Sequence, residues 1–256
     1  MTSFYIQNFG CRVNQAEAFA WAENLENGGL RLEDDAGRAD WVIVNTCTLT
    51  SGADRDVRKF LRRVSRLNPG ARVVVSGCSI EVGALGDDVL SQEWLLLSNG
   101  EKNELPAKVL AQVKNCEAAA SKPLRSRALL KVQDGCNLRC TYCIIPRARG
   151  QSQSLEKEEV LAQARKMTAQ GFREIVVCGI HLCSYGLDHR PESSLAELVI
   201  GLAKIEGIGR IRLSSLDPRS FDDELISLVT GSPKICPHFH LSLQHGSGRI
   251  LRLMGR

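Results

Sequence analysis

The sequence has no long hydrophobic run. Its longest apolar stretches, such as 73–75 and 94–97, hold only a few residues, whereas a membrane-spanning helix needs about 18. The first eight residues carry neither a basic start nor an apolar stretch, so no secretory signal is predicted. These absences exclude a membrane protein. We therefore expect a cytoplasmic protein with no membrane partner.

The chain also has few aromatic residues and little net charge. Three Trp, three Tyr and seven Phe offer no interleaved platform on which single-stranded bases could stack. Residues 1–127 hold 16 basic and 16 acidic side chains, and residues 128–256 hold 17 and 13, giving a net charge of +4. Such a small excess permits an RNA partner but does not require one.

What the chain does have is ten cysteines in 256 residues. Thiols stay reduced in the cytoplasm, where clustered cysteines are more often metal ligands or catalytic groups than disulfides. An apolar content of 43% and a charged content of 24% are typical of a folded globular protein. The length suffices for one large or two ordinary domains.

The first half alternates short apolar runs with helical patterns. The runs lie at 4–7, 41–45, 72–76 and 94–98, and helices are predicted at 14–27 and 53–67, ending at Gly28 and before Asn68. Alternating strands and helices predict a parallel sheet covered on both faces. We place one domain at 1–114 and a linker at 115–127.

The second half, 128–256, repeats this pattern. Its predicted strands are 128–133, 174–178, 210–214 and 238–243, and its predicted helices are 155–170, opening at Ser154, 194–205 and 222–229. A last helix has just begun when the chain stops, with Ile250, Leu251, Leu253 and Met254 lacking a partner surface. We therefore expect a truncated chain, poorly stable and weakly active or inactive by itself.

Three cysteines lie close together in the loop after the first strand of the second half: Cys136, Cys140 and Cys143. Three thiolates on one loop can hold three irons of a [4Fe–4S] cluster and leave the fourth iron open for a chelating molecule. Two other interpretations are a redox pair and a zinc site. A zinc site would need a fourth ligand, for which the candidates are Cys178, His181 and Cys183.

A second set comprises Cys11, Cys47 and Cys78, each just after one of the first three predicted strands. The carboxyl ends of neighbouring parallel strands share one edge, so these thiols are expected to converge on a second three-cysteine metal site. A glycine directly precedes two of them. The alternative is that they pack as small hydrophobic residues. That structural role is favoured for the other four cysteines: Cys116, Cys178, Cys183 and Cys236.

Four motifs give the chain a resemblance to a known family. They are Asn8-Phe-Gly-Cys-Arg-Val-Asn14, Val44-Asn-Thr-Cys-Thr-Leu-Thr50, Ser76-Gly-Cys78 and the run from Gln133 to Gly150 that contains Cys-x-x-x-Cys-x-x-Cys and Ile-Ile-Pro. Over essentially its whole length the sequence resembles the radical-SAM methylthiotransferases. The resemblance implies an α/β fold: an N-terminal flavodoxin-like parallel-sheet domain followed by an incomplete radical-SAM (βα) partial barrel.

The resemblance also implies cofactors and their ligands. Cys136, Cys140 and Cys143 would bind the [4Fe–4S] cluster whose open iron takes S-adenosylmethionine, with Tyr142, Gly179 and His181 near the cofactor. Cys11, Cys47 and Cys78 would hold a second, auxiliary [4Fe–4S] cluster that supplies or carries sulfur. A 5′-deoxyadenosyl radical would activate the inert adenine C2–H bond. No catalytic residue is expected beyond the cluster ligands.

Particular segments resemble the branch that methylthiolates N6-threonylcarbamoyladenosine beside the tRNA anticodon: Gly179-Ile-His-Leu182, Tyr185-Gly186 and Phe239-His-Leu-Ser-Leu-Gln244. The implied partners are tRNA, a reductant such as flavodoxin or ferredoxin, and a sulfur donor. The isopentenyladenosine branch is the alternative substrate class. The sequence departs from the family at Gln244-His-Gly-Ser247, where Gln-Ser-Gly-Ser is usual.

Two non-catalytic functions compete with this one: an iron–sulfur electron carrier and a zinc-stabilised RNA-binding module. A carrier would bury clusters with four protein ligands, whereas both sites here offer three. Arginines at 139, 147 and 149 could hold a phosphate or carboxylate, or could be solvated. The basic run Arg58, Lys59, Arg62, Arg63 and Arg66 either contacts tRNA phosphates or is the solvent face of a helix.

Overall fold

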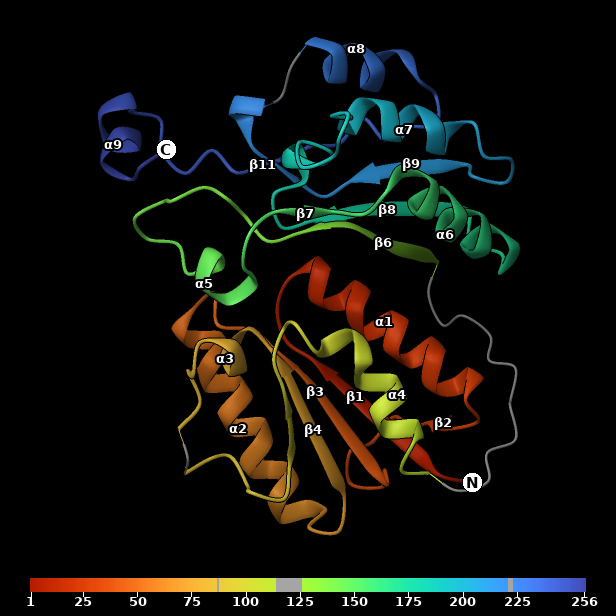
Figure 1. Ribbon diagram of the computed structural model, residues 1–256, viewed down its shortest axis with the longest axis vertical. Coiled ribbons are helices and arrows are strands. Elements are labelled where there is room, and N and C mark those ends of the chain that lie inside the picture. Colours follow the sequence, from red (N-terminus) through yellow and green to blue (C-terminus); the bar gives the residue numbers. More distant parts are fainter. Residues whose placement is uncertain (87, 114–125, 221–222) are drawn as a thin grey trace. The chain divides into compact units, whose positions relative to one another are not determined.

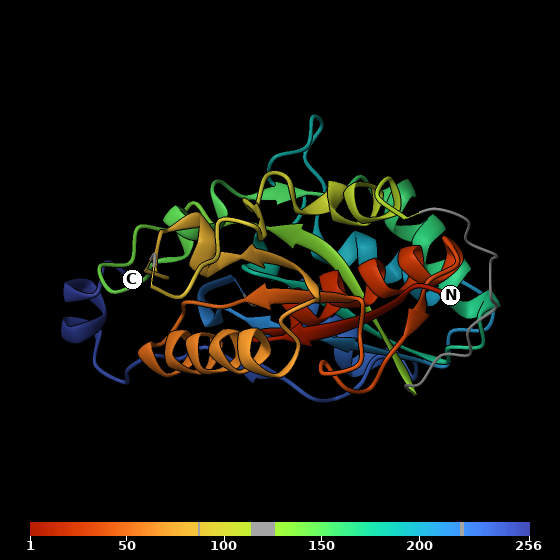
Figure 2. The same cartoon turned by 90° about the horizontal axis from the view of Figure 1, so that it is seen from below.

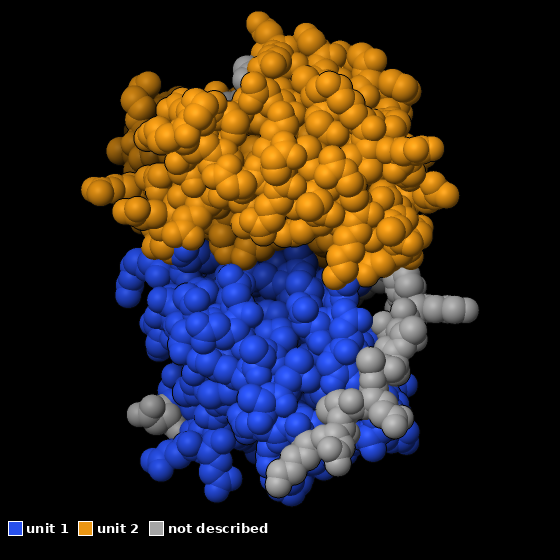
Figure 3. Space-filling model, turned by 45° about the vertical axis from the view of Figure 1, so that its right-hand side comes forward, with its two compact units in different colours: residues 1–122, 147–149 blue, residues 123–146, 150–256 orange. Residues whose placement is uncertain are grey.

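The computed structural model describes residues 1–86, 88–113, 126–220 and 223–256, which form two compact units (Figure 3). Unit 1 comprises residues 1–122 together with 147–149, and unit 2 comprises residues 123–146 and 150–256. Most of the expected linker at 115–127 lies outside the described residues. In the part of the chain that is described, no helix has the length and apolar character needed to cross a membrane.

Unit 1 is built on a five-stranded parallel sheet with the strand order β2-β1-β3-β4-β5, the flavodoxin-like order (Figure 1). The strands are β1 (Ser3–Asn8), β2 (Arg31–Leu32), β3 (Trp41–Thr46), β4 (Arg72–Gly77) and β5 (Leu95–Leu97). The four predicted strands are confirmed, whereas β2 is too short to produce a sequence pattern. Every residue of β3 is buried, as expected of a central strand covered on both faces.

Helices cover both faces of this sheet (Figures 1 and 2). On one face, α1 (Arg12–Asn27) and α4 (Leu105–Leu110) pack against Ile43, and on the other α2 (Ser51–Leu67) packs against Val42 and Val44. Neighbouring β3 side chains therefore lie in two different hydrophobic cores, one on each face of the sheet, because side chains alternate along a strand. The unit also contains α3 (Cys78–Glu81) and a short 3-10 helix, η1 (Lys102–Glu104).

The helix ends of unit 1 follow local sequence signals. Thr50 caps α2 by accepting a hydrogen bond from the Ala53 backbone N–H at 3.1 Å. The chain leaves α1 through Gly28 and Gly29, and Gly29 adopts a φ of +87° that other residues rarely take. The helices predicted at 14–27 and 53–67 are therefore confirmed, each beginning two residues earlier than expected.

Unit 2 contains a four-stranded sheet in the order β7-β6-β8-β9, in which only β7 is antiparallel. Helices α6, α7 and α8 share one hydrophobic core with this sheet, and β10 and β11 form a small separate pair. This is the incomplete (βα) barrel that was expected. The bounds are β6 (Arg127–Asp134), β7 (Gln153–Ser154), α6 (Lys157–Ala169), β8 (Glu174–Gly179), α7 (Leu195–Ala203), β9 (Arg210–Leu213), β10 (Ser215–Leu216), α8 (Asp223–Gly231) and β11 (His240–Leu241).

The remaining short elements are α5 (Ile145–Arg149), the 3-10 helices η2 (Leu182–Ser184) and η3 (Pro218–Ser220), and α9 (Gly248–Leu253). No residue of α9 is buried, and Leu253 is 66% exposed. The apolar positions near residue 250 therefore find little cover within the unit, as the sequence predicted.

Two sequence predictions for unit 2 were wrong. Ser154 does not open α6; it lies in β7, where its hydroxyl accepts a hydrogen bond from Gly186 N–H, and the helix begins at Lys157. The strand predicted at 238–243 shrinks to His240–Leu241, and it pairs with β10 rather than with β9. Both errors arise because a long-range partner, rather than the local pattern, decided the backbone conformation.

Candidate functional site

The first cysteine set lies at the carboxyl ends of three adjacent strands of unit 1. Cys47 directly follows β3, Cys78 directly follows β4, and Cys11 lies between β1 and α1. Burial raises the pKa of the Cys47 thiol, and the neighbouring thiols of Cys78 and Cys11 add smaller increases. Burial likewise raises the pKa of Cys11. Because Cys47 and Cys78 follow two paired strands, and Gly10 beside Cys11 lies against Cys47, the strand order brings these three distant cysteines together.

Glycines make this convergence possible. Gly10, at a φ of +106°, lies so close to Cys47 that a Cβ on it would be 2.6 Å from the Cys47 Cβ and 2.7 Å from its sulfur. Gly77 has a φ of +104°, and a Cβ on it would be 2.6 Å from the Thr46 carbonyl oxygen. Only glycine fits either position, because both the backbone conformation and the space exclude a side chain.

A buried polar network lies beside these cysteines. Asn14 donates to Asn45 Oδ1 at 3.1 Å and to the Thr46 carbonyl at 2.8 Å. The Cys11 thiol donates to Asn14 Oδ1 at 3.2 Å. Glu17 pairs with Lys102 at 2.7 Å although both side chains are about 95% buried. Polar side chains are thus placed in the protein interior next to the thiols, where an uncompensated charge would be costly.

Arg149, which belongs to unit 1, completes the network. Its fully buried guanidinium pairs with Glu17 at 2.8 Å and donates to Asn14 Oδ1 at 2.7 Å, while its Nε lies 3.3 Å from the Cys78 sulfur. Of the two alternatives left open for this arginine, the structure shows a bound carboxylate rather than solvent, and that carboxylate is Glu17 of the protein itself. Arg147 is exposed, as a solvated arginine would be. No local pattern could have predicted the partner, because 132 residues separate Arg149 from Glu17.

The second cysteine set occupies the loop after β6 in unit 2. Burial raises the pKa of the Cys136 thiol, and the thiols of Cys143 and Cys140 raise it further, so the three lie close together. The Cys136 N–H donates to the Gly150 carbonyl at 3.1 Å, and the Cys143 N–H donates to the Cys140 carbonyl at 3.1 Å. These bonds close the loop into a compact turn at the carboxyl end of a parallel strand, the usual ligand-binding edge.

Gln133 fixes the start of that loop. Its buried amide donates to the carbonyls of Asp134 and Gly135 at 2.7 and 2.8 Å and accepts from the His181 N–H at 2.9 Å. Gly135, at a φ of +70°, allows no side chain, because a Cβ would overlap the Gln151 carbonyl. Gln133 was not among the predicted site residues, although a polar residue near the end of a buried strand is a detectable signal.

The residues expected near S-adenosylmethionine lie at the same edge of unit 2. Gly179 ends β8, and a Cβ there would be 3.0 Å from Gln133 Oε1. His181 follows, and its buried Nε2 has no hydrogen-bond partner among the residues that the structure describes; a carboxylate oxygen of Asp217 is 3.6 Å away. Burial lowers the pKa of His181, against the opposing effect of Asp217. The ring is therefore a neutral, unsatisfied polar group suited to a polar ligand.

Tyr142 is half exposed, and its hydroxyl accepts a 3.3 Å hydrogen bond from Arg256. Asp217, just after β10, is bound by Arg219 at 2.7 Å and by Arg256 at 2.9 Å. Burial opposes ionisation of this carboxyl, but the two arginines lower its pKa to about 2. Sequence reasoning did not single out Asp217, which lies three residues beyond the predicted strand at 210–214 and directly follows only the observed β10.

The zinc interpretation gains no support from these positions. Within the described ranges, no three His, Cys, Asp or Glu side chains lie close enough to hold a single metal ion. Cys178 is fully buried and bonds to the Val176 carbonyl, and Cys183 lies 3.9 Å from the Asp217 carbonyl. A four-iron cluster is wider than one ion, so its cysteine ligands stand further apart, and three thiols at each place are the donor type that such a cluster needs. Cys236 is buried, and Cys116 lies outside the described residues.

Comparison with known proteins identifies both parts of the chain. Residues 3–93 match the family described as uncharacterized protein family UPF0004, and residues 130–256 match the radical SAM superfamily. By fold, a radical S-adenosylmethionine methyltransferase, TsrM, from Kitasatospora setae is similar, with a TM-score of 0.64 and 15% identity over 98% of this chain and 61% of that one. The fold and the sequence segments thus define a radical-SAM protein with an N-terminal UPF0004 region.

The chain is similar, more particularly, to radical-SAM methylthiotransferases. It is 38% identical to the threonylcarbamoyladenosine tRNA methylthiotransferase MtaB of Aquifex aeolicus, over 98% of this chain and 65% of the relative. The protein of that name from Chlamydia pneumoniae is also 38% identical, over 99% of this chain and 60% of the relative. The chain therefore spans somewhat less than two thirds of the length of these relatives. The predicted resemblance is confirmed.

Proposed function

We propose that this protein is a tRNA-modifying radical-SAM methylthiotransferase that inserts a methylthio group at C2 of N6-threonylcarbamoyladenosine next to the anticodon. The observation that carries the proposal is the presence of two three-cysteine sets, each at the carboxyl edge of a parallel sheet. Each set leaves one position of a four-iron cluster open, which suits substrate or cofactor binding better than electron storage.

In this proposal each domain has one cofactor task. The radical-SAM core, 128–256, binds one [4Fe–4S] cluster through Cys136, Cys140 and Cys143. The N-terminal domain, 1–114, binds an auxiliary cluster through Cys11, Cys47 and Cys78, and 115–127 links the two. The chemistry supplied with cluster and S-adenosylmethionine bound is reductive cleavage of the sulfonium, which starts radical chemistry at an inert C–H bond.

The protein's own residues position and shield these groups. Gln133 fixes both the beginning of the cysteine loop and the backbone of His181. Gly179 lets the Gln133 side chain approach the end of β8. His181 offers an unsatisfied nitrogen toward S-adenosylmethionine, with the Tyr142 ring beside the last ligand. In unit 1, the Nε–H of the buried Arg149 donates to the Cys78 sulfur at 3.3 Å and so helps to position it.

The substrate assignment is supported by the names of the relatives and by the segments that resemble the threonylcarbamoyladenosine branch. A reductant such as flavodoxin or ferredoxin and a sulfur donor complete the proposed reaction. The cytoplasm is the proposed location because the substrate is tRNA. The isopentenyladenosine branch differs in the adenine substituent rather than in the cofactors, so nucleoside analysis separates the two.

The test begins with anaerobic reconstitution and measurement of iron, sulfide and zinc per chain. Two clusters predict ~8 iron and ~8 sulfide, with ~4 of each in the Cys136→Ala and Cys11→Ala variants. Cys178→Ala is the matched control and should keep ~8. Bound zinc without sulfide would overturn the proposal in favour of a binding module.

The substrate is tested separately, by incubating the reconstituted protein with S-adenosylmethionine, a reductant, sulfide and tRNA that carries threonylcarbamoyladenosine. Mass spectrometry of the nucleosides should show a methylthio group on that base. Methylthiolation only of isopentenyladenosine would assign the protein to the other branch.

A further inference from the structure

Helix α2 concentrates the positive charge of unit 1. It carries six basic and two acidic side chains, a net charge of +4 that equals the net charge of the whole protein. Residues 1–127 are balanced overall, so the rest of that segment is correspondingly acidic. The charge on α2 is therefore a local feature of one helix rather than a property of the whole surface.

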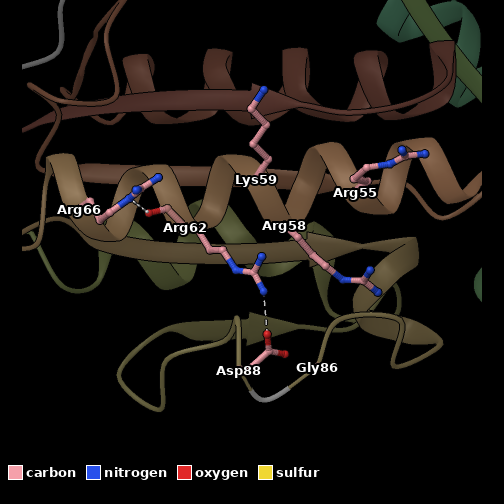
Figure 4. Close-up of a pocket in the computed structure, with 7 residues that line it drawn as sticks. All are labelled: Arg55, Arg58, Lys59, Arg62, Arg66, Gly86 and Asp88. Atoms are coloured by element: carbon pink, nitrogen blue, oxygen red, sulfur yellow. Dashed lines mark hydrogen bonds and ion pairs between the residues drawn. The ribbon is translucent and has the colours of Figure 1, made fainter.

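The helix presents this charge on one side. Val57, Leu61 and Val64 bury the opposite side in the core against the sheet. A cavity of about 500 Å³ opens along the charged side, next to the loop with Gly86 and Asp88. Figure 4 shows the five basic residues that line this basic face: Arg55, Arg58, Lys59, Arg62 and Arg66.

Acidic partners on the protein satisfy little of this charge. Arg62 pairs with Asp88 at 2.7 Å, but both side chains are more than half exposed, so water weakens the pair. Arg58 extends toward the same loop and donates to the neutral Ala84 carbonyl (Figure 4). Over the ranges that the structure describes, Arg55 and Lys59 form no ion pair.

The arrangement works against folding. Arg55 and Lys59, Arg58 and Arg62, and Arg62 and Arg66 are four residues apart, so each pair places like charges side by side on the helix. An ordinary solvent face would alternate charges and gain stability from the opposite pairs. Among the described residues that line the cavity, five are cations and one is acidic, a balance suited to an anionic ligand.

We infer that the basic face of α2 binds the phosphate backbone of RNA, and that it anchors the tRNA substrate; this inference rests on the proposed function. From Arg55 to Arg66 the face extends about 16 Å along the helix axis, enough to meet several phosphates. Guanidinium groups bind phosphate oxygens with two parallel hydrogen bonds. No aromatic side chain lines the cavity, so the face binds the backbone without reading bases.

The test compares two triple variants that each remove three positive charges. The first, Arg55→Gln, Lys59→Gln and Arg66→Gln, changes the basic face but leaves the side-chain bonds of Arg58 to Ala84 and of Arg62 to Asp88 intact. The matched control is Arg38→Gln, Arg165→Gln and Lys204→Gln, which are exposed positions outside α2. Both are measured with fluorescently labelled tRNA by anisotropy over a range of KCl concentrations.

We expect the basic-face variant to raise the Kd for tRNA at least tenfold. The slope of log K against log KCl concentration should become less steep by about 2. The control should stay within about twofold of the parent. Thermal unfolding of the basic-face variant should occur at the same or a higher temperature, because repulsion is relieved. An unchanged Kd and salt slope would overturn the inference.

Two further outcomes distinguish an RNA site from a protein-docking site and from a failure of the proposed function. If the basic-face variant binds tRNA normally but is reduced more slowly by an acidic flavodoxin, the partner is a protein and the inference fails. If the parent binds tRNA through this face but the reconstituted protein methylthiolates no nucleoside, the proposed function fails while the RNA site stands.

Discussion

Asn14 and Asn45 exchange hydrogen bonds in the interior of unit 1. The Asn14 amide donates to Asn45 Oδ1 at 3.1 Å, and the Asn45 amide donates to the Asn14 carbonyl at 2.9 Å. Both side chains are fully buried. Asn14 lies three residues after Cys11, and Asn45 lies two residues before Cys47. The pair therefore ties together two of the segments that carry the first cysteine set.

Replacing Asn45 with alanine should lower the free energy of unfolding by about 1–3 kcal/mol, because it leaves buried polar groups on Asn14 unpaired. Urea denaturation measures the loss. The matched control is Asn24→Ala on α1, the helix that carries Asn14, where an exposed amide donates to the Ala20 carbonyl; its loss should be below about 0.5 kcal/mol. Equal losses would mean that the buried Asn14–Asn45 hydrogen bonds stabilise the fold no more than the exposed Asn24 bond does.

Glu17→Gln tests the buried ion pairs. The change removes the counter-charge of Lys102 and Arg149, whose side chains stay buried, so it should cost about 3–5 kcal/mol of unfolding free energy. In the control, Glu101→Gln breaks a solvent-exposed pair with Lys108 and should leave the urea midpoint nearly unchanged. Urea denaturation of both variants measures the two losses of unfolding free energy. A Glu17 variant as stable as the Glu101 variant would contradict the expected cost.

Gly10→Ala should disturb the first cysteine set selectively. The new Cβ would overlap Cys47, so the reconstituted protein should hold ~4 iron in place of ~8. Gly83→Ala is the control: Gly83 also has a positive φ, of +65°, but a Cβ there meets no atom within 4 Å. Both variants carry backbone strain, and only the first carries the clash. Full iron content in Gly10→Ala would show that the loop can shift without losing the site.

Asp217 should make stability depend on pH in the acid range. Although burial opposes it, the arginine partners lower the pKa of Asp217 to about 2, so the unfolded chain binds a proton more readily. The stabilisation, on the order of 2 kcal/mol, is complete above about pH 4 and is lost as the pH falls toward 2.

Urea unfolding of the metal-free protein at several pH values measures this effect. Asp217→Asn should flatten the fall in stability below pH 4, whereas Glu206→Gln, which removes an exposed carboxylate from the same unit, should not. An Asp217→Asn variant with the pH dependence of the parent would refute the role of the two arginines.

The sequence by itself determined the α/β class, the principal strands and the two cysteine sets. Strongly periodic apolar runs bounded by glycine and proline predicted β1, β3, β4 and most helices, because burial on both faces leaves a clear local pattern. The position of each cysteine directly after a strand was enough to predict that Cys11, Cys47 and Cys78 converge. Short elements such as β2 and β7 left no pattern, since two residues cannot show a period.

Only the tertiary structure decided which polar residues support those sites. Arg149 lies 132 residues from Glu17, and Asp217 lies 36 residues from His181. No local sequence pattern could therefore predict that the members of either pair lie close together. Ser154 carried a helix-start signal that pairing with β6 overrode. Local sequence sets the conformation where the hydrophobic pattern is strong, whereas buried charge pairs and edge strands depend on partners that only the folded chain brings together.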